Sequence, residues 1–454
     1  MTKNKEALFE DYSIPRAVAI LAVPSVLSTL VMVLYNIADS FFVGQLNDTV
    51  QSAAVTLASP VLLAFNAVNN LFGVGAASMM SRCLGKKDYD SVKRTASFAF
   101  WLSVISAAFI SVMSIVLKNP LLGLLGADET NALVTNDYLF YTVTLGAIPA
   151  ILNVVLANMV RSEGESFHAG VGVISGCVLN IILDPFFILP QFLGMGAAGA
   201  GLATFIANCF AMGYLLVVII VKKGRTNISL DPRLFSFRRD IVSEVFGVGV
   251  PAAIQNLLNV TGQIILNQRT AAFGDSAVAA MGYAHKVNLL PLYITMGVTQ
   301  GVMPLISYNF SSGNRKRMKG VINFVLVFTL IATVVLGGML YVFAGDVIRL
   351  FIDVDDVVEI GRELLKAMSI GIPFLALDFL AVAVFQAIGK GLYSLIFAVS
   401  RKIVLEIPAI IILDKLYPLY GMGYSQPAAE FVLAVCAVFM LVRIYRMDPN
   451  ISHK

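Results

Sequence analysis

Long apolar stretches without a charged side chain dominate the chain. No Asp, Glu, Lys or Arg occurs in residues 17–38, 49–81, 95–117, 138–160, 185–221, 245–268, 287–314 or 320–345. A helix of about 20 apolar residues is long enough to cross the roughly 30 Å hydrocarbon core of a membrane. The pattern therefore predicts an all-α polytopic membrane protein.

Dividing the longest stretches at Pro, Gly and polar clusters predicts twelve transmembrane helices. Their expected ranges are 14–43, 52–81, 94–117, 133–159, 169–190, 195–221, 240–267, 277–305, 320–343, 363–388, 392–413 and 424–446. The segment before the first helix is polar and mixed in charge, and the apolar run that follows is too long for a signal peptide. We therefore expect no cleaved leader.

Composition agrees with a membrane protein. Of the 454 residues, 58% are hydrophobic and only 13% are charged, about half of the roughly 25% usual in soluble domains. The four cysteines lie in or beside apolar segments without paired spacing, so we expect neither a disulfide nor a metal site.

Lys and Arg are distributed unevenly between the predicted loops. If the N-terminus is cytoplasmic, twenty-three of them fall on the cytoplasmic side and six on the opposite side. Because loop Lys and Arg set the orientation of membrane proteins, we expect both termini in the cytoplasm.

The chain repeats itself at an offset near 225 residues. Pro24 recurs as Pro251 and Pro149 as Pro373. Six helices per half is an even number, so the halves enter the membrane from the same side and form parallel repeats. We expect two six-helix bundles related by a pseudo-twofold axis along the membrane normal: an N-terminal lobe at 1–221, a basic cytoplasmic linker at 222–239 and a C-terminal lobe at 240–454.

Motifs at the end of the first predicted helix, after the second and after the eighth resemble those of one transporter family. They are Asn36-x-x-Asp39-x-x-Phe42-x-Gly44, Gly73-x-Gly75 followed by Arg82-x-x-Gly85, and Gln300-Gly301 with Pro304, Asn309 and Gly313. In order and spacing they resemble the multidrug and toxic compound extrusion (MATE) transporters, and most of all their bacterial multidrug efflux branch. The resemblance implies export of cationic amphiphiles from a bacterial inner membrane, driven by Na⁺ or H⁺ through alternation of two lobes.

Ionisable residues inside the predicted spans are candidates for function, because they are costly to place in a membrane. They are Asp39, Asp184, Lys286, Asp378, Arg401, Lys402, Glu406 and Glu430. The first half contains two embedded carboxylates and no embedded Lys or Arg. When ionised, Asp39 and Asp184 need a proton, a metal cation or a cationic substrate for compensation.

Two neutral residues extend this candidate coupling site. Asn180 is four residues before Asp184 and shares its helix face, and Thr204 is expected at a similar depth on the sixth helix. In the resembled family, the matching positions of helices 1, 5 and 6 form the first-lobe cation or proton site. If the ion is Na⁺, the oxygens of Asp39, Asn180, Asp184 and Thr204 suit a hard cation; the alternative role is hydrogen bonding between helices.

The sequence supports a second ion site, in the C-terminal lobe, less strongly. Other family members use an acid on helix 7 and one on helix 10, but here helix 7 offers Gln255 where an acid is wanted. Asp378 on helix 10 is either part of a second-lobe ion site or the partner of Lys286, and the sequence does not decide between these two hypotheses. Pro24 in the first helix removes a backbone donor and permits a bend; it is either a moving hinge or a static kink.

Other classes of function fit the residues poorly. The three histidines are scattered and no P-loop occurs, so we expect neither an enzyme nor an ATP-driven pump. The alternative is a flippase of a related fold for a lipid-linked or polyprenyl precursor, whose anionic cargo favours several Arg in the outer cleft. We expect no cofactor beyond the transported Na⁺ or H⁺, small cationic substrates and membrane lipid as partners, no nucleic acid, and a monomer.

Overall fold

The computed structural model describes residues 3–46 and 48–446. These residues form helices and no β-strand, apart from an isolated bridge between Lys223 and Thr226.

The first half contains α1 (Lys3–Glu10), α2 (Ile14–Gly44), α3 (Thr49–Asn69), η1 (Asn70–Val74), α4 (Gly75–Gly85), α5 (Tyr89–Val116), α6 (Lys118–Leu125), α7 (Ala132–Leu139), η2 (Phe140–Leu145), α8 (Ala147–Ser162), α9 (Ser166–Ile188) and α10 (Ala197–Val221). The second half contains η3 (Pro232–Leu234), α11 (Arg239–Thr270), η4 (Ala271–Phe273), α12 (Asp275–Ser311), α13 (Arg315–Val342), α14 (Ala344–Arg349), α15 (Asp355–Ser369), α16 (Ile372–Ala387), α17 (Gly391–Val399), η5 (Ser400–Glu406), α18 (Ile407–Leu416), α19 (Tyr420–Gly423) and α20 (Ser425–Arg446).

The predicted membrane architecture is confirmed. Among the described residues, nine helical stretches are long and apolar enough to cross a membrane, and two bent helix pairs raise the number to eleven. The predicted span at 392–413 is not among them; it corresponds to α17, η5 and α18 and carries Arg401, Lys402 and Glu406. Counting this charged segment, residues 3–46 and 48–446 form twelve spans.

Several helices begin or end outside the predicted ranges. Helix α12 ends at Ser311, six residues after the expected end at 305. Helix α15 begins at Asp355, eight residues before the expected start at 363. The predicted ends follow the limits of the apolar stretches, whereas backbone hydrogen bonding continues into the polar segments beyond them. The short helix α1 was not predicted, because eight residues of mixed charge are too few to form a stable helix alone.

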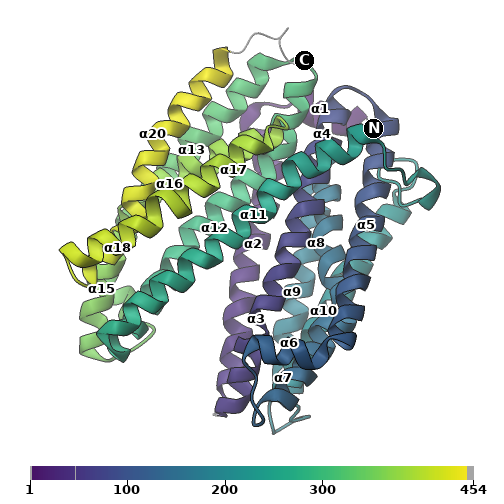
Figure 1. The fold of residues 1–454 in the computed structure, drawn as a ribbon. Helices are drawn as coiled ribbons and strands as arrows, with labels where there is room; N and C mark the ends of the chain where they lie inside the picture. Colours follow the sequence, from purple (N-terminus) through teal and green to yellow (C-terminus); the bar gives the residue numbers. More distant parts are fainter. Residues whose placement is uncertain (1–2, 47, 447–454) are drawn as a thin grey trace.

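Two bundles converge at one end of the molecule and diverge toward the other (Figure 1). We call the end that carries α1 and the last turns of α20 the terminal end, and the opposite end the far end. The first bundle consists of α2 to α10, and the second of α11 to α20. Between them, α12 packs along α2 and α4, and α11 packs along α3, η1 and α4.

Small residues allow these helices to approach closely. A Cβ atom added to Gly249 on α11 would lie 1.9 Å from the backbone oxygen of Leu71 in η1. One added to Gly301 on α12 would lie 2.6 Å from the backbone oxygen of Leu21 on α2. Glycine is therefore required at both contacts between the bundles, as is common where membrane helices pack backbone to backbone.

The helix α1 joins the two bundles at the terminal end. Phe9 is fully buried and stacks on Tyr308 of α12, with ring centroids 4.8 Å apart. The Tyr308 hydroxyl donates to Glu10 at 2.6 Å, and the Arg317 Nε donates to the Phe9 carbonyl at 2.6 Å. On the other side, the Tyr89 hydroxyl of α5 donates to Glu6. The segment before the first span is thus part of the packed structure.

Candidate functional site

The structure brings Asn180, Asp184 and Thr204 together on α9 and α10. Asp184 and Asn180 are buried, at 0% and 1% exposure. In the amide orientation that satisfies both neighbours, Asn180 donates to Asp184 Oδ2 at 2.9 Å and accepts from the Thr204 backbone N–H at 3.1 Å and from its hydroxyl at 3.2 Å. The three residues form one hydrogen-bonded group.

Asp39 completes this cluster from α2. Its Oδ1 is buried and has no hydrogen-bond partner, and its carboxylate is close enough to Asp184 to act on it electrostatically. Asp39 lies five residues before the end of α2, in the half of the molecule toward the far end. The four residues singled out from the sequence therefore share one environment.

Two tyrosines near this cluster were missed by the sequence analysis. Both carboxylates act electrostatically on the hydroxyls of Tyr35 and Tyr138. Tyr35 precedes Asp39 by four residues and so shares its helix face, a signal that could have identified it. Tyr138 comes from α7, and nothing in its local sequence points to the site.

The cluster contains no positive side chain. Neither Lys nor Arg is among the groups that act on Asp39 or Asp184. Within the described part of the chain, no group of three or more His, Cys, Asp or Glu side chains could hold a metal ion. A bound cation would therefore rest on two carboxylates supplemented by the neutral oxygens of Asn180 and Thr204.

In the second bundle, Asp378 and Gln255 line one small pocket together with Arg401. Arg401 forms an ion pair with Glu430, whose side chain is completely buried. Lys402 Nζ lies 2.6 Å from Glu406 Oε1, as the four-residue spacing predicts.

The alternative pairing of Asp378 with Lys286 is wrong. Lys286 is exposed, whereas Asp378 is buried at 3% exposure, and this pair is not among the ion pairs of the described residues. Equal depth on α12 and α16 could not reveal that the two side chains face different surroundings. The basic neighbour of Asp378 is Arg401, brought in by the π-helical segment η5.

A cavity of about 800 Å³, including the part open to solvent, lies between the bundles. Apolar side chains such as Met296, Met303 and Phe379 line it together with polar amides. Gln255 reaches this cavity as well as the small pocket beside Asp378. The four first-bundle site residues do not line it, so the candidate ion site and the central cavity are distinct places.

Arg161 corrects the expected charge distribution of the first bundle. The sequence placed it in a cytoplasmic loop, but it lies in the last turn of α8, is only 8% exposed and lines the central cavity. The first bundle thus contains one buried cation besides its two acids. The apolar stretch ends at Val160, and sequence alone could not show that the next residue points inward.

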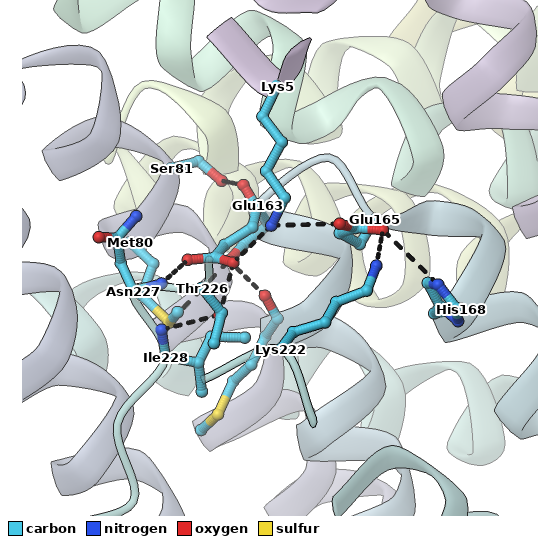
Figure 2. Close-up of polar contacts among 12 residues, drawn as sticks. Lys5, Met80, Ser81, Glu163, Glu165, His168, Lys222, Thr226, Asn227 and Ile228 are labelled. Carbon is cyan, nitrogen blue, oxygen red and sulfur yellow. Dashed lines mark hydrogen bonds and ion pairs between the residues drawn. The ribbon is translucent and has the colours of Figure 1, made fainter. Parts of the chain in front are cut away.

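At the terminal end, a network of charged residues connects α1 to the first bundle and to the segment after α10 (Figure 2). Lys5 Nζ lies 3.1 Å from Glu163 and 3.2 Å from Glu165. Lys222 reaches Glu165 at 2.8 Å, and Thr226 donates to Glu163 at 2.7 Å. Burial alone would raise the pKa of Glu165, but its hydrogen bond to Lys222 and the charges of Lys5 and Lys222 lower it below its ordinary value.

Pro24 does not interrupt α2, which is continuous from Ile14 to Gly44. The Ser28 hydroxyl donates to the Pro24 carbonyl at 2.6 Å. A Cβ atom on Gly170 of α9 would lie 3.0 Å from that carbonyl. The turn at Pro24 is therefore packed closely against α9, and a hinge at this residue stays a prediction.

Two bundles of spanning helices, a cavity between them and acids embedded in the first bundle outside that cavity are the arrangement of a multi-pass membrane transporter. The MatE family model matches residues 24–186 and again 251–412. The chain therefore belongs to the MatE family, a family of transporters, and the predicted repeat and resemblance are confirmed.

Curated relatives cover almost the whole chain. The multidrug export protein MepA of Staphylococcus aureus (strain MRSA252) is 30% identical over 98% of this chain and 96% of its own length. MepA of Staphylococcus haemolyticus (strain JCSC1435) is 31% identical over 95% and 94%.

Solved structures show the same fold. A multidrug resistance MATE transporter of the MOP superfamily, described in an outward-facing conformation, matches with a TM-score of 0.91 at 24% identity and covers 98% of both chains. A MOP superfamily transporter from Pyrococcus furiosus matches with a TM-score of 0.89 at 22% identity, over 99% of this chain and 100% of its own. With the family established, the flippase alternative is not favoured.

Proposed function

We propose that this chain is a secondary antiporter of a bacterial inner membrane that exports cationic amphiphilic compounds in exchange for Na⁺ or H⁺. The observation that carries the proposal is the pair of acids Asp39, which is half-buried, and Asp184, which is fully buried, with no basic side chain among the groups acting on them. Two carboxylates in this setting favour uptake of a cation or proton. The names of the staphylococcal relatives, multidrug export proteins, support the cargo class.

The coupling site comprises Asp39, Asn180, Asp184 and Thr204. Asp184 is already hydrogen-bonded to Asn180, whereas Asp39 Oδ1 has no partner. A proton bound to Asp39 would remove the charge of the carboxylate and allow the carboxyl group to donate a hydrogen bond. A Na⁺ ion would instead bind both carboxylates together with the neutral oxygens of Asn180 and Thr204. Asp378 and Gln255 form the possible second-lobe site, where Arg401 and Glu430 already compensate each other.

The proposed orientation places the terminal end, with both termini, in the cytoplasm, as the excess of Lys and Arg there favours. The proposed lobes are 1–221 and 240–454, joined by the linker 222–239. With this orientation the described state is closed on the cytoplasmic side and open outward. Export then requires the bundles to separate at the terminal end, and coupling requires the ion and the substrate to favour different states.

The test is efflux of a cationic dye from vesicles containing the purified protein, with Na⁺ and pH gradients imposed separately. One charge moved down 100 mV supplies about 2.3 kcal/mol, enough for roughly 50-fold accumulation. We expect one of the two gradients to drive export. Failure of both gradients, together with flipping of an anionic lipid-linked sugar in the same vesicles, would overturn the proposal in favour of a flippase.

A further inference from the structure

Arg161 and Arg401 are the two basic residues that are buried in the described part of the chain, and only Arg401 has an acidic partner. Arg401 pairs with Glu430, Lys402 with Glu406, and Lys5 with Glu163 and Glu165. Among the residues that the structure describes, none forms an ion pair with Arg161, although only 8% of it is exposed. A buried charge without a partner is strongly unfavourable unless another group compensates for it.

The hydrogen bonds of Arg161 are also incomplete. Its Nη1 donates to Asn158 Oδ1 at 2.9 Å, and its Nε is buried without a partner. Asn158 is in turn held by its own bond to the Val154 carbonyl. The guanidinium is thus oriented by a neutral neighbour and retains unused donor capacity.

The surroundings of Arg161 suit an amphiphile. Of the described residues that line the central cavity, Arg161 alone is charged. The remaining lining combines amides from both bundles, such as Asn70, Gln255 and Gln386, with the apolar Met296 and Phe379. Methionine and aromatic side chains adapt to varied apolar bodies, and the amides add donors near the guanidinium.

We propose that Arg161 is a carboxylate-binding subsite in the central cavity and selects substrates that carry a carboxylate on their apolar body. A guanidinium presents paired N–H groups that match the two oxygens of a carboxylate. A single fixed positive charge balances a carboxylate, whereas a phosphate monoester carries nearly two negative charges and calls for more than one cation. Substrates that satisfy both the proposed export of cations and this subsite are zwitterionic amphiphiles.

This inference rests on the proposed export function and specifies its substrate class. It also separates two tasks in space, because the acids of the ion site do not line the cavity that contains Arg161. Ion and substrate need not compete for the same carboxylates.

A matched pair of dyes tests the subsite. Rhodamine 110 carries a free carboxylate, and rhodamine 123 is its methyl ester. Binding of each dye to the purified full-length protein is measured by fluorescence anisotropy for the wild type, Arg161→Gln, Arg161→Lys and the control Arg233→Gln, which removes an exposed positive charge outside the cavity.

We expect Arg161→Gln to raise the Kd of rhodamine 110 by about tenfold or more, since a hydrogen bond to a charged group contributes roughly 1.5–3 kcal/mol. The Kd of the ester should change less than about threefold, a difference of under 1 kcal/mol. Arg161→Lys should keep part of the affinity for the acid, and Arg233→Gln should resemble the wild type. Selective loss of the acid supports the subsite.

Equal weakening of both dyes would overturn the proposal, because it would mean that Arg161 only shapes the cavity. An unchanged affinity for rhodamine 110, or its failure to bind the wild type while the ester binds, would overturn it too. Gradient-driven export of rhodamine 123, the ester, distinguishes failure of the subsite proposal from failure of the antiporter proposal. If the ester is exported but Arg161→Gln does not selectively weaken binding of rhodamine 110, the subsite proposal is wrong and the antiporter proposal is kept. If the ester is not exported either, the antiporter reading itself fails.

Discussion

The guanidinium of Arg82 lies 2.5 Å from the carboxylate of Glu244 and joins the two bundles at the terminal end. Arg82 is on α4 of the first bundle, and Glu244 is in the first turns of α11. Close by, the Ser78 hydroxyl donates to the Gln386 carbonyl on α16 at 2.5 Å. Together with α1, these contacts hold the terminal end closed in the described state.

Breaking this ion pair should favour opening of the terminal end. Because the Glu244 side chain is 45% exposed, the pair contributes about 0.5–1 kcal/mol, as for other exposed pairs. Glu244→Gln should therefore raise the open population about two- to fivefold. The open population is measured by double electron–electron resonance, which gives the distances between spin labels at Lys93→Cys and Lys316→Cys in a protein whose four native cysteines are replaced. The swap Arg82→Glu/Glu244→Arg should restore the wild-type distribution; an unchanged distribution in Glu244→Gln would contradict the role of the pair.

Asp39→Asn and Asp184→Asn should each abolish gradient-driven dye efflux without reducing membrane insertion, since removing a charge eases insertion. The measurement is efflux from vesicles together with the amount of folded protein recovered. Asp353→Asn, at an exposed position outside the bundles, is the matched control. Normal efflux by either Asp39→Asn or Asp184→Asn would remove that residue from the coupling site.

Gly249→Ala and Gly247→Ala form a matched pair on α11. A Cβ at Gly249 would meet the Leu71 carbonyl at 1.9 Å, whereas one at Gly247 has no atom within 4 Å. Overpacking of a close contact costs about 1–3 kcal/mol, so Gly249→Ala should lower the melting temperature and widen the terminal end. Gly247→Ala should be neutral or stabilising by up to about 1 kcal/mol, because alanine favours the helix. Equal melting temperatures for both variants would show that the bundles do not depend on this approach.

Removal of Arg401 should destabilise the second bundle strongly. Arg401→Met leaves Glu430 fully buried without its cation, and breaking such a pair costs roughly 3–5 kcal/mol. The double variant Arg401→Met/Glu430→Leu should recover yield and melting temperature, because no unpaired charge remains from this pair. Arg349→Gln, which breaks an exposed pair with Asp355, should change little. A double variant no better than the single one would rule out the pair as the cause.

The contact of Glu165 with Lys222 should depend on pH in a defined direction. The pKa of Glu165 is lowered from its ordinary value of 4.5, so its stabilisation is fully present above that value and is lost as the pH falls through the lowered pKa. Glu165→Gln should therefore reduce the melting temperature at pH 7, and the difference from the wild type should disappear in acid. Glu129→Gln, at an exposed site, serves as the control. A difference that persists or grows at acid pH would contradict this assignment.

The sequence alone determined the number and course of the spans, the internal repeat and the family. These features depend on periodic or local properties: charge-free stretches are long, and motifs such as that from Asn36 to Gly44 keep their spacing. Asp39 and Asp184 were found for the same reason, because an acid within an apolar stretch is conspicuous. Asn180 followed from helical spacing to Asp184.

Only the tertiary structure decided which groups face each other. Equal depth suggested Lys286 as the partner of Asp378, but the rotation of α12 exposes the lysine, and η5 brings Arg401 to the acid instead. The sequence placed Arg161 in a loop, whereas in the structure it lies in the last turn of α8 and its side chain lines the cavity. Helix α1 is too short to be stable alone, and it is held in place by the stacking of Phe9 on Tyr308 of α12, almost three hundred residues later in the chain. Such contacts depend on the rotation and crossing of helices, which a charge-free stretch does not encode.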